Sequence, residues 1–93
     1  MKESYIESQL VRRIRAAGGL CYKWVSPGCD GVPDRIVILP GGRVIFVELK
    51  TETGWLSKIQ QYTHMTMRER GVDVRTLYGL DQVKAFVKEV VPR

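Results

Sequence analysis

The sequence has few of the residues that build metal clusters or disulfide frameworks. It contains only two cysteines, Cys21 and Cys29, and one histidine, His64, and their spacing matches no zinc-binding pattern. We therefore expect two reduced thiols and a histidine with a surface or packing role. No apolar run approaches the roughly 18 residues of a membrane span. Charged residues occupy the N-terminal positions where a signal peptide is apolar, so we expect a cytoplasmic protein.

The sequence also lacks internal repeats, low-complexity segments and linkers. Its 93 residues are therefore expected to form one domain, 1–93, around one modest core. A hydrophobic fraction of 44% is typical of a folded chain. The balance of 15 basic to 10 acidic residues gives a net charge of +5, which favours polyanionic partners and nucleic acid first. Self-association is also expected, because a core this small often gains from a partner.

Hydrophobic periodicity and turn residues predict seven elements in the order α-β-β-β-α-β-α. An apolar residue at every fourth position predicts a helix over 3–17. The S-x-x-Q pattern of Ser57 and Gln60 predicts a capping box before a second helix, 58–70. The remaining elements are expected at strands 20–25, 34–39, 43–50 and 73–79 and at a final helix, 80–91. The strand after the second helix can lie parallel to 43–50, which predicts an α/β fold with a mixed sheet flanked by helices.

Charged residues stand at one end of the predicted hairpin, beside the runs that are expected to be most buried. Glu48 and Lys50 share a face of the second strand, because side chains alternate along a strand. Asp34 joins them only if opposed positions have an even sum, as a three-residue loop over 40–42 would produce. A two-residue loop would set Asp34 opposite Leu49 on the other face. We predict the even register.

Two carboxylates and an ammonium at one end of a sheet are costly unless a function uses them. A hard divalent cation, Mg²⁺ or Mn²⁺, would relieve the repulsion between Asp34 and Glu48, and the carbonyl oxygen of Leu49 would add a ligand. Lys50 would then lie beside the cation and stabilise negative charge or orient a water. This combination suits hydrolysis of a phosphodiester. The alternative is a surface ion pair of Lys50 with Asp34 or Glu48.

The spacing of these residues resembles a known motif. Pro33-Asp34, followed after thirteen residues by Glu48-Leu49-Lys50, is similar to the motif of the PD-(D/E)XK nucleases, whose restriction-endonuclease-like fold has an α-β-β-β-α-β core. The segments around it, Gly18-Gly19 before a strand with Lys23, GVPDRIV and VELKTETGWLSKIQ, resemble the VRR-NUC group over about residues 3–90. That group includes stand-alone phage and bacterial proteins and the nuclease domain of larger repair enzymes. The resemblance implies a Mg²⁺-dependent DNA endonuclease in a bacterial or phage-infected cell.

The resemblance also implies a set of site residues. In this family the PD aspartate, the ExK glutamate and the carbonyl between the glutamate and the lysine bind the metal, and the lysine is catalytic; these positions fall on Asp34, Glu48, Leu49 and Lys50. A glutamate of the first helix often completes the site as a metal ligand, and here Glu7 is the best match and Glu3 the alternative. The family's glutamine falls on Gln60, whose other interpretation is the helix cap with Ser57.

Basic, polar and aromatic residues outside this set are candidates for contact with DNA. These candidates are Arg12, Arg13, Lys23, Ser26, Trp55 and Lys58. The arginines are equally consistent with a solvated helix face, and Trp55 with a dimer contact or a core anchor. Tyr62, Met65 and the region of Met67 are expected to be packing or dimer surface.

The stand-alone members resemble archaeal Holliday junction resolvases, so the resemblance favours a homodimer that makes paired cuts in four-way junctions. A flap- or nick-type endonuclease is the alternative, since the longer repair enzymes use a similar domain as a monomer with extra domains. A non-catalytic basic DNA-binding module is a further alternative, which the intact set of Asp34, Glu48 and Lys50 argues against. A restriction-type enzyme is disfavoured, because the chain has little room for base-reading insertions.

Overall fold

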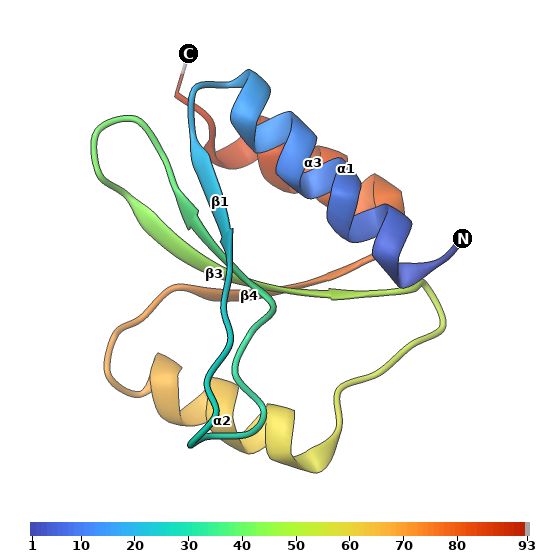
Figure 1. Cartoon of the computed structure of the whole chain (residues 1–93), viewed down its shortest axis with the longest axis vertical. Coiled ribbons are helices and arrows are strands. Elements are labelled where there is room, and N and C mark those ends of the chain that lie inside the picture. The colour runs from blue at the N-terminus through green and yellow to red at the C-terminus, as the bar shows by residue number, and fades with distance from the viewer. Residues whose placement is uncertain (93) are drawn as a thin grey trace.

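The computed structural model describes residues 1–92 and contains the seven elements in the predicted order (Figure 1). The helices are α1 (Glu3–Ala16), α2 (Lys58–Arg68) and α3 (Gly79–Val90), and the strands are β1 (Leu20–Lys23), β2 (Arg35–Ile38), β3 (Val44–Lys50) and β4 (Val74–Tyr78). The predicted order is confirmed, and β1 ends two residues earlier than expected. Within residues 1–92 no helix is both long and apolar enough to cross a membrane.

The four strands form one mixed sheet in the order β1-β2-β3-β4. The pairs β1–β2 and β2–β3 are antiparallel, whereas β4 runs parallel to β3 after the crossover through α2, as predicted. Figure 1 shows α1 and α3 side by side over one face of the sheet and α2 below the other face. The N-terminus of α1 lies close to the end of β3 in the same view.

The hydrophobic core lies between the sheet and the pair α1 and α3. The predicted apolar stripe of α1 is buried there, with alternate residues of the sheet and the inner face of α3: Ile6, Leu10, Ile14, Val37, Ile45, Val47, Leu49, Val83, Phe86 and Val90. The face covered by α2 is different, because the buried residues of that helix are Thr63 and His64. The opposite face of the sheet therefore holds polar groups away from water.

The loop of the β2–β3 hairpin sets the register of its strands. The amide of Leu39 donates to the carbonyl of Arg43 at 2.9 Å, which closes a three-residue loop over 40–42. The two glycines of this loop have φ values of 95° and 92°, in the region that favours glycine. Arg35 consequently pairs with Val47. The predicted even register is confirmed.

Candidate active site

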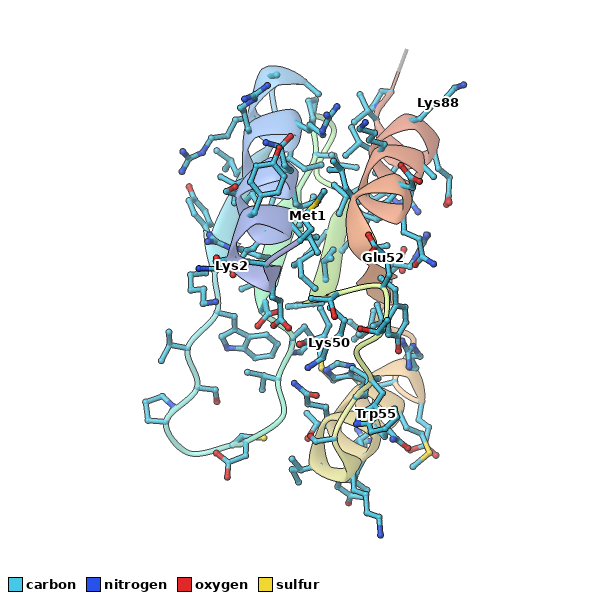
Figure 2. All side chains as sticks on the ribbon, turned by 90° about the vertical axis from the view of Figure 1, so that its right-hand side faces the viewer. Met1, Lys2, Lys50, Glu52, Trp55 and Lys88 are labelled. Carbon is cyan, nitrogen blue, oxygen red and sulfur yellow. The ribbon has the colours of Figure 1, made fainter. Side chains whose placement is uncertain are left out.

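The even register brings Asp34 to Glu48 at the end of the sheet. Arg35 pairs with Val47, so the same register, extended one residue beyond the start of β2, sets Asp34 opposite Glu48. Glu3, Asp34 and Glu48 each offer a carboxylate oxygen, and these oxygens lie within 4.8 Å of one another. Glu3 reaches this cluster from the first turn of α1. Figure 2 shows Lys50 in the space between α1 and α2, so four charged side chains from three segments converge there.

The structure reverses the order of preference between the two glutamates of α1. Oε2 of Glu7 accepts hydrogen bonds from Lys23 at 2.9 Å and from Arg35 at 2.7 Å, and Glu7 is not part of the carboxylate cluster. Burial raises the pKa of Glu7, but these two hydrogen bonds outweigh it and the pKa is lowered. Glu3, one helical turn nearer the N-terminus, is the residue that faces Asp34 and Glu48.

The main-chain carbonyl of Leu49 has no amide to pair with on the neighbouring strand. Hydrogen-bonded pairs recur at every second position of an antiparallel ladder. Counted from the bond between Leu39 and Arg43, the register sets Pro33 opposite Leu49, and proline has no N–H. The amide of Leu49 donates instead to Oδ2 of Asp34 at 3.0 Å. Within residues 1–92 the register therefore offers the carbonyl oxygen of Leu49 no N–H partner on the side of β2.

Glu48 is held at one oxygen by two side chains. Nε2 of Gln60 donates to its Oε2 at 3.2 Å, and Nζ of Lys50 lies 3.6 Å from the same atom. Gln60 also forms the predicted capping box with Ser57. The backbone N–H of Gln60 donates to Oγ of Ser57, and the side-chain Oε1 of Gln60 accepts from the backbone N–H of Ser57. One glutamine side chain therefore makes both sets of contacts that the sequence suggested.

The environment of Glu48 favours its neutral form when no cation is bound. The residue is only 1% exposed. Burial and then the negative charge of Asp34 raise the pKa of Glu48 to about 8, although the charge of Lys50 opposes the shift. Carboxyl groups with strongly raised pKa values cluster at functional sites. A divalent cation next to Glu48 would displace the proton, because the positive charge of the cation stabilises the ionised carboxylate that burial disfavours.

His64 belongs to this cluster, although the sequence indicated only a surface or packing role. It is fully buried on α2, and its Nε2 lies 4.0 Å from Oε1 of Glu48. The signal that would have found it is its position four residues after Gln60, which puts both side chains on one face of the helix. Burial is the main cause that lowers the pKa of His64, so the imidazole is neutral at pH 7.

Basic residues predicted to contact DNA lie on one side of the carboxylates. Arg12 lines an open groove of about 490 Å³ along α1, together with Arg15 and Arg35. Nζ of Lys23 lies 4.0 Å from Oδ1 of Asp34 and is half-exposed, which places a cation between the groove and the carboxylates. Arg35, which lines the groove, and Lys23 both contact Glu7, so this carboxylate links the groove to the cation beside Asp34.

The other predicted contacts are more scattered. Trp55 is 83% exposed, so the interpretation of this residue as a core anchor is wrong. It precedes α2, whose first residue, Lys58, is also exposed; Figure 2 shows Trp55 in front of that helix. Ser26 is half-buried and lines an apolar pocket of about 250 Å³ with Trp24. Arg13 is half-buried and does not line the arginine groove.

Glutamine substitutions separate the two glutamates of α1. We expect Glu3→Gln to weaken Mn²⁺ binding about tenfold, because a carboxylate oxygen beside Asp34 and Glu48 is lost. Glu7→Gln is expected to change the affinity less, since Glu7 contacts two cationic side chains instead of the cluster. Titration calorimetry with Mn²⁺ measures both. A larger loss in Glu7→Gln would contradict this assignment.

Known proteins share this architecture. A solved structure described as "VRR_NUC domain" superposes with a TM-score of 0.89 and 32% sequence identity, over 95% of this chain and 96% of that chain. Among curated proteins, "Putative nuclease p44" of Acyrthosiphon pisum secondary endosymbiont phage 1 is 56% identical over 50 residues. These residues are 54% of each protein, so the match spans about half the length of that curated relative. No protein-family model matches the chain.

Proposed function

Because the chain belongs to the VRR-NUC family of nucleases, we propose that it is a metal-dependent DNA endonuclease that hydrolyses phosphodiester bonds at the end of β3. The observation that carries this proposal is the convergence of Glu3, Asp34 and Glu48 beside Lys50. A module that only bound DNA would be weakened by carboxylates facing the phosphates. Their presence in a chain of net charge +5 points to chemistry at the backbone of the nucleic acid.

The donor set fits Mg²⁺ or Mn²⁺. These cations prefer oxygen ligands, and every side-chain donor in the cluster is a carboxylate. Oε1 of Glu48 is buried and has no hydrogen-bond partner, so a cation would satisfy it. The residues that would hold the cation are Glu3, Asp34, Glu48 and, through its carbonyl, Leu49. When bound, such a cation polarises a phosphate and lowers the pKa of a water molecule.

Lys50 supplies a positive charge fixed in place. Its side chain is 15% exposed, so the ammonium is held against Glu48 yet remains accessible to a substrate. In the proposed reaction Lys50 stabilises the negative charge that develops on the scissile phosphate and orients the attacking water. Gln60 keeps Oε2 of Glu48 in position through its hydrogen bond.

Basic side chains near the cluster suit contact with a DNA strand. We assign phosphates of the backbone to the groove of Arg12 and Arg15, to Lys23 and to the exposed Lys58 at the start of α2. The exposed indole of Trp55 provides a surface for stacking on an unpaired base. Binding through these contacts weakens steeply as the salt concentration rises.

We further propose that the protein is a homodimer that cleaves Holliday junctions. Large apolar side chains are exposed on α2: Ile59, Tyr62 and Met65. Exposed apolar patches on small proteins often mark interfaces, and a second copy of the same patch would cover this one. Two sites related by a twofold axis would make paired cuts in a symmetric four-way junction. A monomer would make one cut at a time.

The substrate is tested by incubating the protein with labelled four-way junction, flap and linear duplex in Mg²⁺, Mn²⁺ or EDTA. We expect paired cuts in the junction that depend on metal, and a dimeric mass in size-exclusion chromatography with light scattering. Cleavage that persists in EDTA would contradict the proposed site. Preferred cleavage of the flap by a monomer would favour the flap-type alternative, and binding without cleavage would favour the non-catalytic module.

A further inference from the structure

His64 and Glu48 each bury a polar atom that has no hydrogen-bond partner. Within residues 1–92 both ring nitrogens of His64 and Oε1 of Glu48 lack a well-formed hydrogen bond, and the two side chains are 0% and 1% exposed. The backbone of Gly31 lies close enough to the imidazole to raise the pKa of His64, against the larger effect of burial. Unpaired polar atoms in a protein interior are costly and uncommon. An apolar residue at position 64 would fill the same space without this cost. The histidine therefore calls for a functional explanation.

The unpaired atoms of the two residues lie close together. Nε2 of His64 is 4.0 Å from Oε1 of Glu48, whereas Oε2 is the atom that Gln60 and Lys50 contact. A direct N–H···O bond needs about 2.7–3.2 Å, so an approach of about 1 Å would form it. Gln60 and His64 stand one turn apart on α2. The helix thus places one side-chain nitrogen near each oxygen of Glu48.

We propose that His64 is a positioning residue for Glu48, whose Oε1 accepts a hydrogen bond from Nε2–H of His64 when the carboxylate binds the divalent cation. This inference rests on the proposed function. Unlike Lys50, a neutral donor orients the carboxylate without cancelling the negative charge that attracts the cation. His64 and Gln60 together would fix both oxygens and so the direction in which Glu48 faces Asp34 and Glu3.

Mn²⁺ binding to the free protein, measured by calorimetry, tests this role apart from catalysis. We expect His64→Leu to weaken Mn²⁺ binding about tenfold, within the range observed for residues that orient metal ligands. His64→Gln keeps an N–H donor near the position of Nε2 and is expected to stay within about threefold of the wild type. Thermal unfolding without metal shows whether both variants are folded. Wild-type affinity in folded His64→Leu, or an equal loss in both variants, would overturn the proposal.

The unmodified protein provides a second measurement. It contains a single histidine, so the imidazole ¹⁵N signals of an untagged sample belong to His64 without further assignment. On addition of Mg²⁺ we expect the tautomer with the proton on Nε2, in a hydrogen bond. A proton on Nδ1 in the presence of Mg²⁺ would overturn the proposal even if His64→Leu failed to fold.

Failure of this inference is distinguishable from failure of the proposed function. Asp34→Asn serves as the reference, because it removes a carboxylate of the cluster itself and is expected to abolish Mn²⁺ binding. If the wild type bound no Mn²⁺, both the metal site and the role of His64 would be overturned. If the wild type bound Mn²⁺ and Asp34→Asn did not, an unchanged His64→Leu would overturn the role of His64 alone.

Discussion

Lys50→Ala is expected to lower the rate of DNA cleavage about 100- to 1,000-fold, which is the usual effect of removing one group that stabilises charge in a transition state. The ammonium of Lys50 lies 3.6 Å from Oε2 of Glu48, two residues before it on β3. Single-turnover cleavage of a four-way junction with saturating Mg²⁺ measures this effect. Mn²⁺ affinity at pH 8.5 is expected to change much less than the rate, since Lys50 is not a ligand.

Lys88→Ala is the matched control for this substitution. Lys88 is exposed on α3, and Figure 2 shows it far from Lys50 at the other end of that helix. We expect this variant to cleave at the wild-type rate. Equal losses in Lys88→Ala and Lys50→Ala would mean that both act only through the net charge of the protein. Full activity of Lys50→Ala would refute the proposed role of the lysine.

Glu48→Gln is expected to abolish cleavage and at the same time to stabilise the metal-free protein at pH 8. The folded state holds the Glu48 proton up to a pKa of about 8, whereas the ordinary value is 4.5. Above pH 4.5 the unfolded chain releases that proton and the folded chain does not, so stability falls as the pH rises towards 8. Glutamine is neutral at every pH and removes this loss. In EDTA at pH 8 we expect an unfolding temperature about 5–10 °C above the wild type.

The quantity to measure is the difference in unfolding temperature between Glu48→Gln and the wild type, followed from pH 5 to pH 8. Burial of His64 lowers its pKa and makes stability rise with pH below its usual value of 6.5, but this contribution is common to both proteins. Differential scanning calorimetry in EDTA is expected to show an advantage for Glu48→Gln that grows with pH. A constant or shrinking advantage would contradict a buried, protonated Glu48. Saturating Mg²⁺ is expected to stabilise only the wild type.

Most of the fold follows from local features of the sequence. Apolar periodicity predicted α1, the capping box of Ser57 and Gln60 predicted the start of α2, and glycines marked the hairpin loop. The position of Asp34 beside Glu48 followed as well, because strand pairing has a period of two and the loop length selects between two registers. Each of these features depends on residues that are close together in the chain.

Only the tertiary structure shows that Glu3, and not Glu7, lies beside Asp34 and Glu48. The two glutamates stand one turn apart on the same face of α1, so helical periodicity treats them alike. Which of them lies beside Asp34 depends on the position of α1 along the sheet, and so on which of its turns lies next to the end of β3. Lys23 and Arg35, from β1 and β2, then hold Glu7 away from the cluster.

The roles of His64 and Trp55 were likewise beyond the sequence. Histidine and tryptophan are each found both in protein interiors and on protein surfaces, and the neighbouring residues in the chain do not show which location applies. Burial is set by packing between segments far apart in the chain: α2 lies over the polar face of the sheet, which encloses His64 beside Glu48 and leaves Trp55 exposed. The sequence by itself determined the pairing that sets Asp34 beside Glu48 and the order of the elements. The tertiary structure decided which more distant side chains surround Glu48, because only the packing of the helices on the sheet brings them within reach of it.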